Sequence, residues 1–259
     1  MDNRLILKQV KDNPMILGDI ENPSEEVIVT AIKKNGIAIK FIDNPSFALK
    51  KEAIKSNPLS IEFIKDLDEE LAIFSVKLLW NSLKLIKNPS ENVKREAVMT
   101  KGWAIQYIED PSEELCLLAV GKDYDAVKYI NTPSEAVQIK AVENYWGAIR
   151  FIDNPSLVVK RRAIEINEEA IHFIQNYDLD ELKTFIGDNI NVVKYIYDSI
   201  EPELVVEVIV EKLENDDFTE KFMRDFLELE ILDMDKGKLV WEFGSKRAKK
   251  IVADHILGK

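Results

Sequence analysis

The side chains that most often carry out catalysis are few in this chain and stand far apart in the sequence. His172 and His255 are its two histidines and Cys116 is its one cysteine. The sequence has no glycine-rich phosphate motif, no His-Glu-x-x-His, no paired cysteines and no serine flanked by glycines. A metal site or a histidine-based catalytic centre needs more of these groups than the chain offers. We therefore expect no enzyme activity, no catalytic residue, no metal site and no cofactor.

Aromatic residues form the most distinctive candidate site. They recur at one turn in four consecutive segments, and three of the four tryptophans of the chain belong to this set: Trp80, Trp103, Tyr124, Tyr145 and Trp146. Aromatic rings are enriched at the energetic centres of protein interfaces, so a ridge of exposed rings would suit a protein partner. The alternative is that each ring packs on the neighbouring turn as part of the fold.

A strict repeat positions these rings. Steps of 22 residues connect an unbroken column of isoleucines: Ile20, Ile42, Ile64, Ile86, Ile108, Ile130, Ile152, Ile174 and Ile196. An aromatic residue or leucine precedes nearly every one, and a small residue stands four positions before most of them. These columns predict the core, with Ile108 and Ile130 as central core residues.

Each repeat reads as two helices. Spacings of three and four within Ala148, Ile149, Phe151 and Ile152 describe one face of a short second helix. A first helix of about a dozen residues precedes it. Asn-Pro-Ser and related triplets separate the repeats, and we interpret the residue before proline as the N-cap. A glutamate three residues later would close a capping box, as Glu25 and Glu91 do after Asn22 and Asn88.

Such small units bury their apolar faces only against their neighbours, so the sequence predicts an all-α solenoid of two-helix repeats. The pattern acidic-x-x-Val-(x3)-Ala-Val-(x3)-Gly-x-Ala-Ile-x-Phe/Tyr, seen in residues 25–41 and 91–107, resembles a widespread, uncharacterised class of bacterial and viral helical repeats known only as a domain of unknown function. The resemblance covers Asp12 to Ser199 and implies the fold without an active site. The regular Asn-Pro-Ser triplets depart from that class.

The period is lost after residue 198. We expect residues 1–198 to form the solenoid and residues 199–259 to form an acidic C-terminal cap within the same structural unit. Between Glu201 and Asp235 there are 13 acidic and three basic residues. This segment is either a solvated polar face or a surface for a basic partner. Alternation over 238–243 predicts a short strand or extended segment, and Ser245 should cap a last helix, 246–257, whose basic residues pair with the acidic stretch.

We expect a non-enzymatic interaction protein that binds or inhibits another protein through its extended surface. One alternative is nucleic-acid binding along a basic edge, which the net charge of −12 disfavours; this edge would comprise Lys33, Lys34, Lys55, Lys77 and Lys101. The other alternative is an enzyme with an unrecognised site. The single cysteine and the absence of a long apolar run favour a cytoplasmic protein without a membrane span. Richness in Ile, Lys and Asn suits a low-GC bacterium or its phage.

Overall fold

The computed structural model describes residues 3–257, and every regular element in that range is a helix. The chain forms two compact units, Met1–Thr132 and Pro133–Lys259. Their boundary lies within the repeat array, after the sixth repeat. The sequence-based division after residue 198, by contrast, marks the loss of the period.

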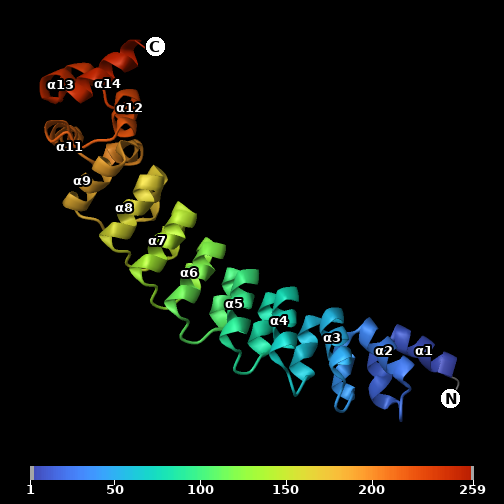
Figure 1. Ribbon diagram of the computed structural model, residues 1–259. Coiled ribbons are helices and arrows are strands. Elements are labelled where there is room, and N and C mark those ends of the chain that lie inside the picture. Colours follow the sequence, from blue (N-terminus) through green and yellow to red (C-terminus); the bar gives the residue numbers. More distant parts are fainter. Residues whose placement is uncertain (1–2, 258–259) are drawn as a thin grey trace. The chain divides into compact units, whose positions relative to one another are not determined.

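Within its described residues, the first unit consists of six helix pairs, whose α-helices follow one another in sequence order (Figure 1). Each pair is a ten-residue α-helix and a six-residue 3₁₀-helix. The bounds are α1 (Asn3–Asp12), η1 (Pro14–Asp19), α2 (Glu25–Lys34), η2 (Gly36–Phe41), α3 (Phe47–Ser56), η3 (Pro58–Phe63), α4 (Glu69–Leu78), η4 (Trp80–Leu85), α5 (Glu91–Thr100), η5 (Gly102–Tyr107), α6 (Glu113–Lys122) and η6 (Tyr124–Tyr129).

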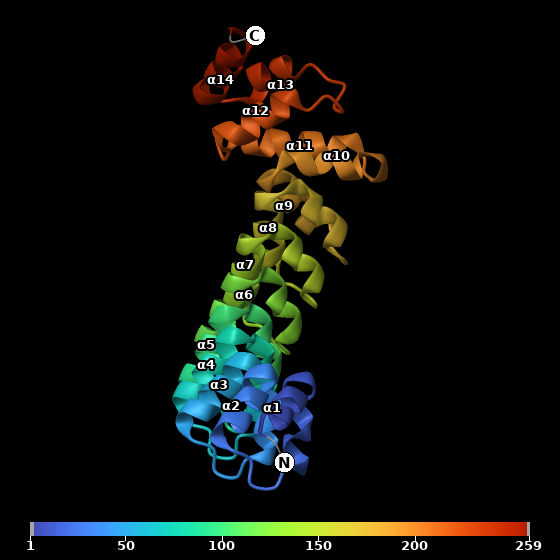
Figure 2. The ribbon, with the colours of Figure 1, turned by 90° about the vertical axis from the view of Figure 1, so that its right-hand side faces the viewer.

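The second unit contains three further repeats and a helical cap (Figure 2). The repeats are α7 (Glu135–Asn144), η7 (Trp146–Phe151), α8 (Leu157–Ile166), η8 (Glu168–Phe173), α9 (Leu179–Asp188), η9 (Ile190–Val192) and α10 (Val193–Ile196). The cap is η10 (Tyr197–Ser199), α11 (Pro202–Glu214), α12 (Glu220–Glu228), α13 (Lys236–Phe243) and α14 (Lys246–Leu257). These elements confirm the predicted all-α repeat fold.

The second helix of each repeat is a 3₁₀-helix because it is short and held at both ends. In the second repeat it runs for six residues between Asn35 and Ile42, which both have extended backbone (φ −151° and −107°). A 3₁₀-helix rises about 2.0 Å per residue, so it spans a given distance with fewer residues than an α-helix needs. Ala38 and Ile39 point into the core from this segment.

The N-cap prediction was wrong by two residues. The serine of each Asn-Pro-Ser triplet is the cap, and Ser46 Oγ accepts a hydrogen bond from Leu49 N at 3.3 Å. The first residue of six triplets instead has left-handed backbone, with φ between 45° and 54°: Asn22, Asn44, Asn88, Asp110 and Asn154 before proline, and Asn176 before Tyr177. Asn and Asp tolerate this region better than other side chains, which explains their presence there. The glutamates therefore lie in the first helical turn, where they favour the helix dipole without forming the predicted box.

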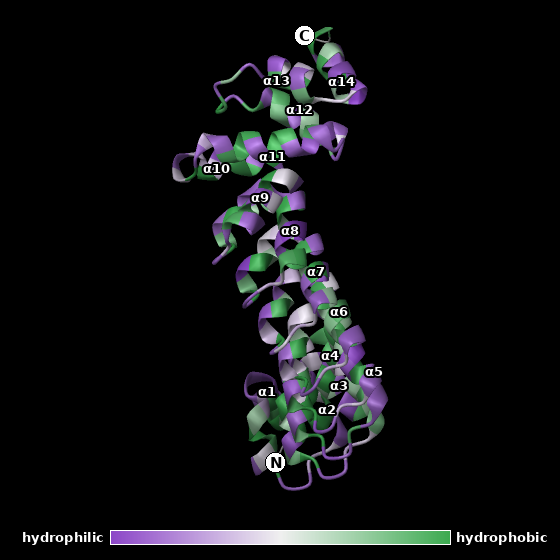
Figure 3. Ribbon diagram, turned by 90° about the vertical axis from the view of Figure 1, so that its left-hand side faces the viewer, coloured by the Kyte–Doolittle hydropathy of each residue, from purple (hydrophilic) through white to green (hydrophobic). Residues whose placement is uncertain are grey.

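The core lies between the α-helices and the 3₁₀-helices, and its deepest positions differ from those predicted. Ile105 and Val127 are 1% exposed, whereas Ile108 is 8% exposed and Ile130 is only half-buried. The invariant isoleucine column is thus less deeply buried than the middle of the 3₁₀-helices: five members are 5–8% exposed and four are half-buried. All of them except Ile196, which ends α10, follow a 3₁₀-helix in extended backbone. The aromatic column before the isoleucines is half-buried or exposed and does not lie in the core: Phe41 is 39% exposed, and Tyr107 and Tyr129 are half-buried. Figure 3 shows the resulting alternation of apolar and polar residues along the helices.

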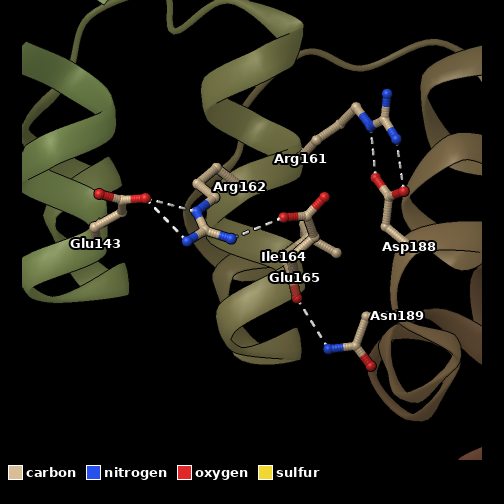
Figure 4. A network of polar contacts seen from close by, with 7 residues as sticks. All are labelled: Glu143, Arg161, Arg162, Ile164, Glu165, Asp188 and Asn189. Carbon is tan, nitrogen blue, oxygen red and sulfur yellow. Dashed lines mark hydrogen bonds and ion pairs between the residues drawn. The ribbon is translucent and has the colours of Figure 1, made fainter. Parts of the chain in front are cut away.

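Polar side chains also join successive repeats. In the second unit, Arg162 lies between Glu143 and Glu165, and Arg161 makes two hydrogen bonds to Asp188 at 2.7 and 2.8 Å (Figure 4). Asn189 donates to the backbone oxygen of Ile164 in the same view. These contacts link the eighth repeat to the seventh and to the ninth.

The C-terminal cap corrects one prediction and confirms another. Residues 238–243 belong to helix α13, which Asp235 caps by accepting from Lys238 N at 2.8 Å, so the predicted strand was wrong. Six alternating residues carry too little periodicity to separate a strand from a helix. Ser245 does cap the last helix, accepting from Ala248 N at 3.2 Å. Arg247 of that helix lies 3.6 Å from Asp216, in the acidic stretch.

Candidate binding surface

The five predicted binding residues all lie at the beginnings of 3₁₀-helices. Trp80, Tyr124 and Trp146 are the first residues of η4, η6 and η7, Trp103 is the second residue of η5, and Tyr145 precedes η7. All five are half-buried, not fully exposed as a free ridge would be. They therefore contribute both to packing and to the surface.

In the first unit, the tryptophans pack on the aromatic column of the following repeat. Trp80 stacks on Tyr107 with ring centroids 5.9 Å apart, and Trp103 meets Tyr129 edge-on at 6.1 Å. This partner column is the one that the sequence placed in the core. The structure thus joins two sequence columns into one surface feature, which sequence spacing alone did not reveal.

Lysines lie over the same rings. Lys40 Nζ is 4.8 Å from the Phe41 centroid and 6.0 Å from that of Phe63. Lys128 Nζ is 4.7 Å from the Trp103 centroid and 5.0 Å from that of Tyr129. Each ammonium group therefore contacts rings from two successive repeats, an arrangement that cation–π attraction stabilises. We call the set Lys40, Phe41, Phe63, Trp80, Lys84, Trp103, Tyr107, Tyr124, Lys128 and Tyr129 the first-unit track. Lys84 joins it as the residue equivalent to Lys40 in the fourth repeat, and Tyr124 joins it as the predicted binding residue at the start of η6.

Trp103 is the most firmly held ring of this track. Its Nε1 donates to Asp125 Oδ1 at 2.6 Å, and Lys128 Nζ lies 3.0 Å from Asp125 Oδ2. Lys101 Nζ lies over the same indole at 4.7 Å. Burial acts to raise the pKa of Asp125, but the hydrogen bonds from Trp103 and Lys128 outweigh it and lower that pKa. Asp125 therefore stays ionised and fixes the orientation of the ring.

The second unit repeats the pattern. Trp146 packs against Tyr145 at 5.4 Å and against Phe173 of the next repeat at 6.0 Å. The Arg150 guanidinium lies 4.6 Å from the Phe173 centroid. His172 is exposed and meets Tyr195 edge-on, with ring centroids 4.9 Å apart. We call Tyr145, Trp146, Arg150, Phe151, Phe173 and Tyr195 the second-unit track.

The aromatic repeats have lost a helix cap that the other repeats keep. In five repeats an asparagine precedes the 3₁₀-helix and its side chain accepts from the backbone two residues later: Asn13, Asn35, Asn57, Asn167 and Asn189. In the four consecutive aromatic repeats this position makes no side-chain cap and holds Leu79, Lys101, Asp123 and Tyr145. The sequence-based prediction missed this exchange, although aligning the repeats by their 22-residue period brings these positions into one column.

The two other candidate surfaces are partly neutralised by ion pairs. On the predicted basic edge, Lys77 lies 3.2 Å from Glu96, and Lys101 lies 2.6 Å from Asp123. Lys101 is also half-buried. Within the acidic segment, Lys221 pairs with Asp225 at 2.6 Å and Arg224 with Glu220 at 3.3 Å. Neither surface is a simple patch of one charge.

Groups suited to chemistry are not brought together in the part of the chain that the structure describes. Cys116 is buried, and desolvation, together with Glu113, raises the pKa of its thiol. A thiol with a raised pKa is protonated at neutral pH and is a poor nucleophile. Among residues 3–257, no three His, Cys, Asp or Glu side chains gather as metal ligands.

A cavity of about 510 Å³ lies in the first unit between the loops that follow η3 and η4. Its lining mixes apolar residues with Lys65 and Lys87 and with Asp68 and Glu69. This mixture of charges favours neither an anion nor a cation. None of the five predicted binding residues lines it.

The helices within residues 3–257 include none with the length and apolar composition that a membrane span requires. The tracks place flat rings and long cations side by side on the surface, which suits recognition of another molecule.

Comparison of the chain with protein-family models, curated proteins and solved structures gives no match.

Proposed function

We propose that this is a non-enzymatic helical-repeat protein that binds another protein through the first-unit and second-unit tracks. The observation that carries the proposal is the exchange in four consecutive repeats of a capping asparagine for a turn that holds large rings. The resemblance to uncharacterised bacterial and viral repeats agrees with this role but assigns no partner. A cytoplasmic location fits a chain with one cysteine, which cannot form an internal disulfide.

Stability alone gives little reason for that exchange. A capping side chain contributes about 1 kcal/mol, and an aromatic pair contributes about 0.5–1.5 kcal/mol beyond its buried area. The loss and the gain are therefore of similar size. The surface, however, changes greatly, because the outer repeats hold Gly36, Pro58 or Glu168 where three of the four central repeats hold Trp80, Tyr124 or Trp146. The fifth repeat holds Gly102 there and has its ring, Trp103, at the next position.

Half-buried rings suit binding because they are already ordered. Contacts with neighbouring rings and with Asp125 hold Trp103 in place before a partner arrives. These side chains therefore lose less conformational entropy when a partner binds. Trp and Tyr are also the side chains most enriched among interface hot spots.

A pair of matched variants tests the proposal. The protein is immobilised and its partner is captured from the native host, after which the dissociation constant of the purified pair is measured. Trp103→Leu combined with Trp146→Leu should weaken binding at least about thirtyfold, or about 2 kcal/mol. Trp241→Leu is the control, because Trp241 is 59% exposed on α13 and lies outside both tracks.

Stability must be measured on the same samples, because Trp103 also donates to Asp125. Binding that falls while the protein remains folded at the assay temperature supports the proposal. Unchanged binding in the double variant would contradict it and direct attention to the acidic segment Glu201–Asp235. Equal losses in the double variant and in Trp241→Leu would also contradict it.

A further inference from the structure

The spacing of the first-unit track limits the shape of a segment that could follow it. Packed helical layers lie about 10 Å apart, so equivalent rings of successive repeats recur at about that distance. A polyproline II helix has three residues per turn and rises about 3.1 Å per residue, which returns a side chain to the same face every 9.3 Å or so. An extended strand changes face at every residue, so its third side chain points away. The polyproline II period therefore matches the repeat.

The shape of the track favours the same conformation. Its rings are half-buried or just over a third exposed, with Phe41 at 39% and Phe63 at 37%. Each repeat thus offers a shallow apolar contact to a single side chain. Polyproline II segments dock on such aromatic surfaces, and their stiffness reduces the entropy lost on binding.

The charges of the track favour an acidic segment. The 3₁₀-helices η2–η6 carry three lysines, Lys40, Lys84 and Lys128, and two acids, Glu62 and Asp125. Asp125 is already bonded to Trp103 and Lys128. Lys40 and Lys84 are exposed, and Lys40 lies over two rings. This face is thus weakly positive in a chain whose net charge is −12.

We propose that the first-unit track binds an acidic, proline-containing peptide segment in the polyproline II conformation, with one of its three faces directed at the rings. Prolines on that face pack on the exposed parts of the rings, and carboxylates on the adjacent face pair with Lys40 and Lys84. This inference rests on the proposed function and adds the chemical class of the partner segment.

Synthetic peptides test the inference directly on the full chain. A fluorescein-labelled peptide of repeated Asp-Pro-Pro triplets presents a carboxylate at every third position. A permuted peptide of the same composition carries all its aspartates at one end, and a Lys-Pro-Pro peptide reverses the charge. Fluorescence anisotropy should show binding of the triplet peptide, at least about tenfold weaker binding of the permuted peptide, and none of the Lys-Pro-Pro peptide.

Matched variants place the binding on the track. Lys40→Gln with Lys84→Gln should weaken binding of the triplet peptide about tenfold, because two ion pairs are lost at low salt. Lys33→Gln with Lys55→Gln makes the same charge change at exposed positions in the last turns of α2 and α3 and should have no effect. Equal effects of the two pairs would overturn the inference.

Other ligands distinguish the failure of this inference from failure of the proposed function. Equal binding of triplet and permuted peptides overturns the polyproline II assignment. An alanine-rich helical peptide with glutamates seven residues apart is a second probe. If it binds more tightly than the triplet peptide, and if Lys40→Gln with Lys84→Gln weakens that binding, the polyproline II assignment is overturned but the track remains a protein-binding surface. If oligothymidylate binds more tightly than the triplet peptide, and if Lys40→Gln with Lys84→Gln weakens that binding, both the inference and the proposed protein partner are overturned.

Discussion

Truncation of Ile105 should reveal the core that the structure describes. Ile105 is 1% exposed and lies in the middle of the 3₁₀-helix η5. Ile105→Ala removes three carbons, each contributing about 0.8 kcal/mol through burial, and leaves a cavity that adds to the loss. The free energy of unfolding should therefore fall by about 3–4 kcal/mol.

Two neighbouring variants calibrate this value. Ile130 is half-buried, so Ile130→Ala should cost about 1–2 kcal/mol, and exposed Gln106→Ala should change stability by less than about 0.5 kcal/mol. Urea unfolding followed by far-ultraviolet circular dichroism measures all three variants. An equal loss at Ile105 and Ile130 would refute the inference that the core centres on the middle of each 3₁₀-helix.

Three further outcomes follow from local geometry. Asn57→Ala should cost about 1 kcal/mol of stability in urea unfolding, because Asn57 Oδ1 accepts from a backbone amide at 3.1 Å. Gly36→Ala should destabilise by about 1–3 kcal/mol or more in the same assay, because a Cβ there would lie 2.0 Å from a backbone carbonyl oxygen of α3. Hydrogen bonds from Trp103 and Lys128 lower the pKa of Asp125 in the folded protein, so the ionised carboxylate stabilises the fold. This stabilisation is fully present above the unfolded pKa of about 4, and it is lost as the pH falls through the lower folded pKa. Trp103→Phe should reduce this acid-side loss in thermal unfolding measured from neutral to acidic pH.

The repeat made most of the fold predictable. A 22-residue period with apolar positions three and four apart indicates paired helices that bury their faces on their neighbours. The cap register was not predictable in the same way, because Asn22 and Ser24 are both good N-cap types and only the backbone distinguishes them. Nor could six residues of the second helix separate α from 3₁₀ geometry.

The candidate site was predictable in position but not in environment. Counting by 22 residues located Trp80 and Trp103 at the same turn, yet it placed their partners Tyr107 and Tyr129 in the core. Both are half-buried, and each is the last residue of its 3₁₀-helix. Hydrophobic spacing reports that a residue is apolar and periodic, but it does not separate a core face from a half-covered surface.

Site-specific photocrosslinking tests the proposed binding surface most directly. Phe63 and Phe47 are comparably exposed, at 37% and 43%, but Phe63 belongs to the first-unit track and Phe47 begins helix α3. Benzoylphenylalanine replaces each phenylalanine in turn, and because both rings are more than a third exposed, the added benzoyl group can extend into solvent. The protein is then irradiated with its captured partner. We predict a covalent adduct with the partner from position 63 and none from position 47. An adduct from position 47 alone would contradict the assignment of the track as the binding surface.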